Sequence, residues 1–509
     1  MTGALPRLKG LVRQALRRDL KREVRKRSVR EDAIRSILES RTVAGIGPQP
    51  LPLILSLFAL LAFSSCAPLP TLDDYATLGA ATAPKVLGPD APLPPEVSNA
   101  LMEGLTKQVA PTDMLQRYAR RMDVVSGSPW VTGNKVTLLI DGPAAFEAML
   151  TAIRGAKDHI NIETFSFSDD AVGQRFAEAL LQKQKEGVQV NLLYDSVGSW
   201  PTPAAFFRRL RDGGIQVREF NPINPLKVRG DEWRLTHRDH RRIVIVDGTV
   251  AFTGSSNLSN IFLSGLFWGP TREQEGEHVQ PAWRDTDVQI AGPAVAKLQE
   301  LFLETWASQK GPEATRNYFP PLTRAGDDLV QVIGSAPGRT QRLSYLMYLS
   351  AFTHAENVIH LTTPYFVPDV QMMKALTDAA ERGVDVKIIL PGNNDSNLVF
   401  HAGRSHYAAL LESGVKVYER GTEAILHAKT AVIDGLWSTV GTSNLDSWSL
   451  LHNDEVDVVV VGRDFAAKME AMFEEDLGTS TQIHLAEWKT RPFTDRIKEW
   501  FTSVFGRWL

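Results

Sequence analysis

The feature that most constrains the fold is a motif that occurs twice along the chain. The first copy is His240-Arg-Arg242-Ile-Val-Ile-Val-Asp247, followed after six residues by Gly254-Ser-Ser-Asn257. The second copy is His427-Ala-Lys429-Thr-Ala-Val-Ile-Asp434, followed after six residues by Gly441-Thr-Ser-Asn444. A single His-x-cation pair is common by chance, but two copies with the same internal spacing predict an internal duplication.

The sequence around each copy predicts the same order of secondary structure. Residues 160–167 alternate like a strand, residues 170–186 have helical spacing, and residues 188–194 form a second strand pattern. The apolar centre of each motif predicts a third strand, and the whole order recurs over 358–363, 372–383, 384–390 and 430–433. Strands interleaved with helices predict an α/β fold. We therefore expect two similar halves, residues 125–315 and 328–482.

The two motifs carry the residues for phosphodiester chemistry. Residues i and i+2 of a strand face the same side, so His240 with Arg242, and His427 with Lys429, are expected to point into one site. One neutral imidazole can attack phosphorus and hold a covalent phosphoryl group. The other imidazole, when protonated, can give its proton to the leaving oxygen.

The remaining motif residues fit the same chemistry. The two cations and the amides of Asn257 and Asn444 would stabilise negative charge on the phosphate oxygens. A buried carboxylate behind a histidine would hold its tautomer. Neither a metal nor another cofactor is expected, because the chain has one cysteine and its histidines are scattered.

These motifs resemble those of the phospholipase D superfamily, and within it most closely those of bacterial cardiolipin synthases. The resemblance extends over roughly 130–490 and includes the stretches 163–170, 194–198, 220–222, 283–287, 363–368, 444–446 and 453–455. It implies two tandem phospholipase D-like domains, each a mixed sheet flanked by helices, that form a pseudo-dimer with one shared active site. Two phosphatidylglycerols, or a related pair of phospholipids, would then be joined into cardiolipin.

The resemblance also assigns roles to particular residues. It implies that His240 and His427 are the catalytic pair, with His240 the nucleophile, and that the rest of the catalytic set is Arg242, Asp247, Lys429 and Asp434. Glu455 and Asp287 resemble the carboxylates that orient a catalytic imidazole, although a surface salt link is an equal interpretation. Arg242 stands where the family pattern has Lys, and its larger, rigid fork predicts an altered rate or substrate preference.

Four functions fit these observations. The first is phosphatidyl transfer, and the second is phospholipase D hydrolysis with water as the acceptor, which needs the same residues. The third is a superfamily nuclease; no nucleic-acid partner is expected, because the chain beyond residue 65 is strongly acidic. The fourth is an inactive lipid-binding protein, for which Arg242 is the only support.

Both ends of the chain have patterns typical of membrane association. A basic, helix-like leader over 1–50 precedes an apolar segment, 51–66, that resembles a secretory signal and ends at the lone Cys66, a candidate for lipidation. A linker and N-terminal helical region are expected over 67–124, and an amphipathic helix over 483–509. These features predict a membrane-associated protein of the bacterial envelope. The alternatives are a disordered tail, an unused upstream start, and a C-terminal helix that docks on the protein itself.

Overall fold

The computed structural model describes residues 83–88, 91–109, 112–224, 227, 233–262, 283–313, 315–337, 342–421 and 424–504. The expected leader 1–50, the segment 51–66 with Cys66, the first part of the linker, and residues 505–509 lie outside the described residues. No described helix is long and apolar enough to cross a membrane.

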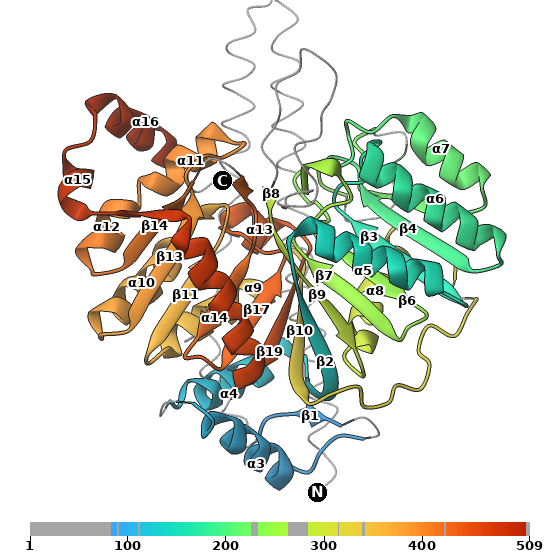
Figure 1. Ribbon diagram of the computed structural model, residues 1–509, viewed down its shortest axis with the longest axis horizontal. Helices are drawn as coiled ribbons and strands as arrows, with labels where there is room; N and C mark the ends of the chain where they lie inside the picture. Colours follow the sequence, from blue (N-terminus) through green and yellow to red (C-terminus); the bar gives the residue numbers. More distant parts are fainter. Residues whose placement is uncertain are drawn as a thin grey trace, which may run out of the picture. The chain divides into compact units, whose positions relative to one another are not determined.

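One large sheet runs through the described chain (Figure 1), and its strand order is the same in both halves except that β20 extends the second half. In the first half the order is β2 (Trp130–Ile140), β9 (Thr286–Ala291), β7 (Val250–Gly254), β6 (Ile243–Val246), β3 (His159–Thr164), β4 (Gln189–Asp195) and β5 (Gln216–Phe220). In the second half it is β10 (Asp328–Ser335), β19 (Glu455–Val461), β17 (Trp437–Gly441), β16 (Thr430–Ile433), β11 (Val358–Thr362), β13 (Asp385–Pro391), β14 (Lys416–Arg420) and β20 (Ser480–Ile483). The duplication expected from the motifs is thus present in the fold.

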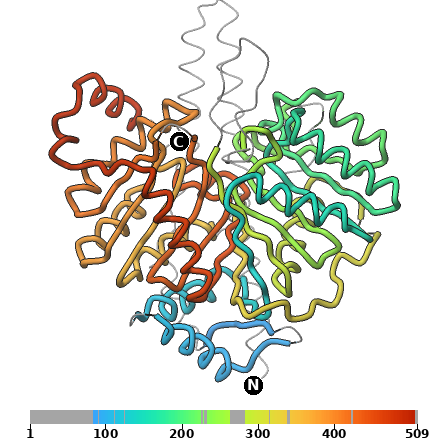
Figure 2. Tube along the Cα trace, viewed as in Figure 1, coloured from blue at the N-terminus to red at the C-terminus, as the bar shows by residue number. Residues whose placement is uncertain are grey.

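The strand directions also repeat. β3 runs parallel to β4 and antiparallel to β6, and β11 has the same relation to β13 and β16. The halves join where β10 pairs antiparallel with β2, so the sheet continues across the seam between them. The trace in Figure 2 keeps the two halves on opposite sides of this seam.

Helices cover both faces of the sheet. In the first half α5 (Asp141–Gly155), α6 (Ala171–Lys185) and α7 (Ala204–Asp212) pack on one face and α8 (Val295–Ser308) on the other. The second half has the counterparts α9 (Leu343–His354), α10 (Val370–Glu381) and α12 (Tyr407–Glu412) on one face and α14 (Arg463–Gly478) on the other. The first helices of the described part of the chain, α3 (Pro95–Thr106) and α4 (Met114–Ser126), share a core with α9.

Burial on both faces explains the composition of the central strands. β19 is Glu-Val-Asp-Val-Val-Val-Val, and all seven residues are buried. Val459 and Val461 lie in the core beneath α9, whereas Val458 and Val460 lie in the core beneath α14. A strand covered on both sides has a continuous apolar run in place of alternation.

The shorter elements lie near the seam and at the C-terminal end. The short strands are β1 (Val86–Leu87), β8 (Trp283–Arg284), β12 (Phe366–Val367), β15 (Ile425–Leu426) and β18 (Leu445–Asp446), and the short helices are η3 (Asn260–Phe262), α11 (Asn397–Arg404), α13 (Ser447–His452), α15 (Leu485–Lys489) and α16 (Phe493–Ser503). The helix expected over 483–509 is therefore divided, because Pro492 cannot continue α15 and caps α16.

Candidate active site

The two histidines are held by backbone contacts with the opposite half. The His240 amide donates to the Asp454 carbonyl at 2.9 Å, and the His427 amide donates to the Arg284 carbonyl at 2.8 Å. Just before His427, β15 pairs in parallel with β8 of the first half. The segment that carries each histidine is therefore positioned by the half to which it does not belong.

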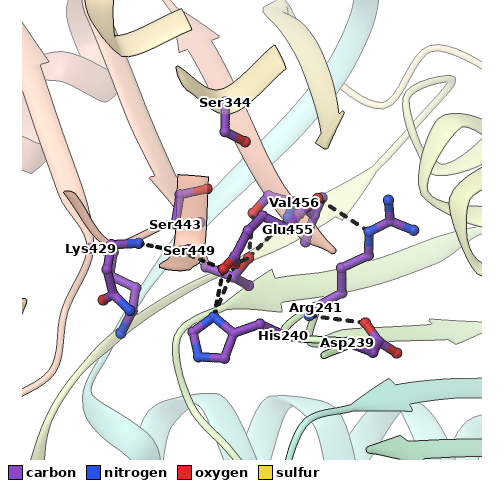
Figure 3. A network of polar contacts seen from close by, with 12 residues as sticks. Asp239, His240, Arg241, Ser344, Lys429, Ser443, Ser449, Glu455 and Val456 are labelled. Atoms are coloured by element: carbon purple, nitrogen blue, oxygen red, sulfur yellow. Dashed lines mark hydrogen bonds and ion pairs between the residues drawn. The ribbon is translucent and has the colours of Figure 1, made fainter. Parts of the chain in front are cut away.

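Glu455 of the second half fixes the imidazole of the first. Its two oxygens lie 2.9 and 3.0 Å from His240 Nδ1, and it also accepts from the hydroxyls of Ser449 and Thr442, each at 2.5 Å (Figure 3). Glu455 is fully buried. A carboxylate held by three donors has one orientation, so the ring of His240 has one orientation as well.

The opposite pair repeats this arrangement. The carboxylate of Asp285, in the first half, lies 2.8 Å from Nδ1 of His427 and also accepts from the Thr286 amide. Glu455 is the first residue of β19, and Asp285 directly precedes β9. β19 and β9 are the strands next to β10 and β2, which pair at the seam. Each half thus supplies the carboxylate for the histidine of the other half.

A cation lies beside the second nitrogen of each ring. Arg242 Nη2 is 3.0 Å from His240 Nε2, and Lys429 Nζ is 3.2 Å from His427 Nε2. Arg242 can only donate, and Lys429 can only donate in its protonated form, so these contacts assign the lone pair to Nε2 and the proton to Nδ1, where the carboxylate accepts it. Lys429 also lowers the pKa of His240, and Arg242 that of His427, so the two Nε2 atoms and the two cations lie near enough to act on one another.

Arg242 makes more contacts than Lys429. Its Nε donates to Asn257 Oδ1 at 3.0 Å, and its guanidinium lies 5.6 Å from the ring centre of Phe165. Asn257 Oδ1 also accepts from the Ser166 amide. The guanidinium Nε–H, which Lys lacks, thus holds Asn257 within the site.

The counterpart amide has no such partner. Asn444 is buried, and its Oδ1 makes no hydrogen bond to any described residue. The oxygen and nitrogen of an amide are assigned from their contacts, so either can face a ligand here. A buried amide with one atom unsatisfied among the described residues suits a phosphate oxygen.

The structure corrects the expectation for Asp287. Its carboxylate accepts from the hydroxyl of Ser256 at 2.5 Å and contacts neither histidine; Asp285, two residues earlier, takes that place. Alternation puts both carboxylates on the same side of the strand, so the pattern alone did not distinguish them. An alignment of 283–287 with 453–457 would have matched Glu455 to Asp285 and Asp457 to Asp287.

Asp287 and Asp457 instead hold the glycine turns. Asp457 accepts from Ser443 at 2.6 Å and from Ser344 at 2.7 Å, as Asp287 accepts from Ser256. A Cβ on Gly254 or Gly441 would collide with the carboxylate of the neighbouring Asp. The glycine of each motif is therefore required for close approach of turn and strand.

Asp247 and Asp434, which were expected in the catalytic set, directly follow the far ends of β6 and β16. Asp247 accepts from the amides of residues 157–159, and Asp434 accepts from the amides of residues 356–358 and from the Thr112 hydroxyl. Each lies five residues beyond the cation of its motif, about 17 Å along the strand. Their position makes them caps of a tight turn.

Aromatic rings that the sequence did not single out surround the histidines. Phe165 meets the His240 ring edge to face at 5.1 Å, and Trp283 and Phe262 lie 4.7 and 5.4 Å from the His427 ring. Phe165, Phe262 and Trp283 are on three different segments of the first half. Rings in this position keep water from the imidazoles and strengthen the charge interactions there.

Burial and the cations set the protonation of the rings. Burial, with repulsion from Arg242 and Lys429, holds the pKa of His240 well below its usual value, and the same causes lower the pKa of His427 to about 3. Burial and repulsion from Arg242 also lower the pKa of Lys429 to about 7. Both imidazoles are therefore neutral before an anion binds.

The two carboxylates differ from each other. Burial raises the pKa of Glu455 to about 8, against the hydrogen bonds from Ser449 and Thr442. Burial also acts on Asp285, but attraction to His427 and the hydrogen bond from it outweigh burial and lower the pKa of Asp285 below its ordinary value. Of the two histidine–carboxylate pairs, Asp285–His427 thus contains the carboxylate with the lower pKa, which stays ionised.

The fold and the site together define a single-chain, two-histidine enzyme that acts on phosphodiesters. A family model described as "Cardiolipin synthase, PLD-like domain" matches residues 149–263 and 348–477. The chain belongs to this family of phospholipase D-like proteins.

Characterised relatives agree with this assignment. The chain is 34% identical over 401 residues to a cardiolipin synthase of Halalkalibacterium halodurans, covering 78% of this chain and 76% of the relative. It is 36% identical over 358 residues to cardiolipin synthase A of Pseudomonas aeruginosa, covering 70% and 69%. A phosphatidylserine synthase structure from Haemophilus influenzae has the same fold, with a TM-score of 0.57 at 14% identity over 78% of this chain and 98% of that one.

Proposed function

We propose that the protein transfers a phosphatidyl group between phospholipids and makes cardiolipin from two phosphatidylglycerols. The observation that carries this proposal is the pair of Nε2 atoms, each beside a cation and each backed by a carboxylate from the other half. The relatives named cardiolipin synthase support the choice of lipid. Membrane association is part of the proposal, because both substrates are lipids.

The first step forms a covalent intermediate. His240 Nε2 attacks the phosphorus of one phosphatidylglycerol, a phosphorus–nitrogen bond forms, and the bond from phosphorus to the glycerol oxygen breaks. His427 gives its proton to the glycerol oxygen, and glycerol leaves. The bound phosphate is an anion, which raises the pKa of a neighbouring imidazole and lets His427 carry that proton.

The second step reverses the first with a new alcohol. The glycerol hydroxyl of a second phosphatidylglycerol gives its proton to His427, and its oxygen attacks phosphorus while the bond to His240 breaks. The products are cardiolipin and the free enzyme. Arg242, Lys429, Asn257 and Asn444 stabilise the phosphate oxygens in both steps.

The different carboxylates support this division of roles. The firmly ionised Asp285 favours a proton on His427, as a general acid requires. Burial favours neutral forms of both His240 and Glu455, as a nucleophile requires. The same residues would serve hydrolysis if water replaced the second lipid, which would release phosphatidic acid.

The test is lipid analysis after incubation of the purified protein with labelled phosphatidylglycerol in detergent micelles. We expect cardiolipin and glycerol from the wild type and neither from His240→Ala or His427→Ala. Quenched wild-type protein should retain labelled phosphate that is stable in alkali and released in acid, as a phosphohistidine is. Phosphatidic acid as the main product would instead identify a phospholipase, and unchanged lipid would contradict both.

A further inference from the structure

Helix α16 exposes apolar side chains and buries polar ones, the reverse of an ordinary surface helix. Glu499 and Thr502 face inward and are 2% and 7% exposed. Its outer face, defined here as Phe493, Ile497, Trp500 and Val504, is 72%, 49%, 70% and 61% exposed. These four positions follow one another at helical spacing and share an arc of about 60°. A helix docked by the hydrophobic effect would present the opposite arrangement.

Charge, and not apolar burial, fixes the orientation of this helix. Glu499 receives two hydrogen bonds from Arg491, at 2.6 and 3.0 Å, and lies 3.7 Å from Arg404 of α11. The two guanidinium groups lie 4.2 and 4.8 Å from the ring centre of the buried Trp488. Rotation of the helix about its axis would separate the buried carboxylate from its two arginines, and a buried charge without a partner is strongly unfavourable. The apolar face is therefore held outward.

This face lies on the same edge of the sheet as the active site. Arg242 and Lys429 directly precede β6 and β16, whose first residues pair with the carboxyl ends of β3 and β11. Helix α11 follows the carboxyl end of β13, which is at the same edge, and α16 packs on α11. Figure 1 shows α16, α11 and α13 along this edge. Two further exposed aromatics, Trp200 after β4 and Trp448 of α13, belong to segments that leave the same edge.

We infer that the outer face of α16 lies in the head-group region of an anionic lipid surface and holds the active-site edge against it. Exposed Arg496 borders the apolar arc, where it can reach anionic head groups while the arc is immersed. Exposed Lys498 lies further round the helix, 3.4 Å from Asp495. The four side chains expose roughly 500 Å², less than the ~800 Å² that each partner of a stable dimer buries. The inference rests on the proposed function only for the choice of lipid.

The experiment follows the position of α16 directly. Cys66 is the only cysteine, so Cys66→Ser with Ile497→Cys gives one site for an environment-sensitive fluorophore in the full chain. The matched control is Phe319→Cys in the same background. Phe319 is 45% exposed, and its neighbours Tyr318 and Pro320 contact the β6–β7 turn at the opposite edge. Vesicles of phosphatidylcholine with phosphatidylglycerol, and of phosphatidylcholine alone, are the probes.

We expect a blue shift and loss of aqueous quenching at position 497 on the anionic vesicles, a weaker response on phosphatidylcholine alone, and no change at position 319. Equal signals at both positions, or no signal at 497 under conditions where the protein sediments with vesicles, would overturn the inference. A signal at 497 that depends on protein concentration without vesicles would identify a second copy as the occupant and would overturn it too.

A functional readout separates this inference from the proposed activity. Ile497→Glu with Trp500→Glu should weaken vesicle affinity by at least about tenfold and leave turnover in detergent micelles unchanged. Phe319→Glu should change neither. If the enzyme makes no cardiolipin but the fluorophore still reports immersion at 497, the proposed activity fails and the docking face stands.

Discussion

Asp285 provides the sharpest test of the reciprocal arrangement, through Asp285→Asn. The carboxylate is fully buried and lies 2.8 Å from His427 Nδ1. An amide keeps the shape and the accepting oxygen but removes the charge that stabilises the protonated ring. Unit charges about 4 Å apart at an effective dielectric of about 20 attract by about 4 kcal/mol. At about 1.4 kcal/mol per tenfold, the expected loss in kcat is about a thousandfold.

The matched control is Asp287→Asn on the same strand. Its carboxylate holds Ser256 rather than a histidine, and burial together with repulsion from Asp285 raises its pKa to about 7, so it carries a partial charge at neutral pH. We expect it to keep kcat within about tenfold of the wild type. The assay is the rate of cardiolipin formation in mixed micelles, with the melting temperature of each variant measured alongside.

The pH profile separates a role in positioning from a loss of fold. Asp285 raises the pKa of His427, and a general acid must be protonated, so the rate falls as pH rises through that pKa. Without Asp285 this fall moves to lower pH. Equal losses in Asp285→Asn and Asp287→Asn, or an alkaline limb that does not move in Asp285→Asn, would refute the reasoning.

Three further outcomes are expected. Arg242→Lys should retain activity within about tenfold, because the charge stays and only the bond to Asn257 is lost, whereas Arg242→Met should lose at least about a hundredfold in the same assay. Asp247→Ala leaves three backbone amides without their acceptor and should lower the free energy of unfolding by about 2 kcal/mol in denaturant titrations, with specific activity per folded protein within about threefold. Glu163 is fully buried with Arg241 3.9 Å away, and burial outweighs the attraction to Arg241 and raises the pKa of Glu163 to about 7. Stability from such a group is lost as pH rises toward the folded pKa, so Glu163→Gln should raise the melting temperature at pH 8 and have little effect at pH 5.

The sequence was sufficient to predict that two distant histidines share one site. Repeated motif spacing and the alternation of side chains along a strand can be read from nearby residues alone. Helical periodicity is local in the same way, so the strands and helices expected around His240 and His427 were close to the observed elements. Residues 170–186 and 372–383, for example, correspond to α6 and α10 within two residues at each end.

What the sequence did not predict depends on contacts between distant segments. Asp285 was missed because alternation puts Asp285 and Asp287 on the same side of the chain, and only an alignment of 283–287 with 453–457 separates them. The backbone bond from His427 to Arg284, which aligns the two segments, leaves no local pattern. The apolar positions of α16 were visible, but the inward direction of Glu499 depends on Arg491 and Arg404. Periodicity identifies two faces of a helix and does not say which one is buried.

The exchange of carboxylates between the halves has a consequence for how the enzyme is made. His240 and its cation leave the ribosome long before Glu455, so a nascent chain that has folded its first half holds an imidazole without its partner. Neither histidine is oriented until translation has passed residue 455 and the two halves have closed on each other. A chain that ends before residue 455, whether from a stalled ribosome or from proteolysis, therefore has no oriented histidine with which to cleave the lipids of its own cell.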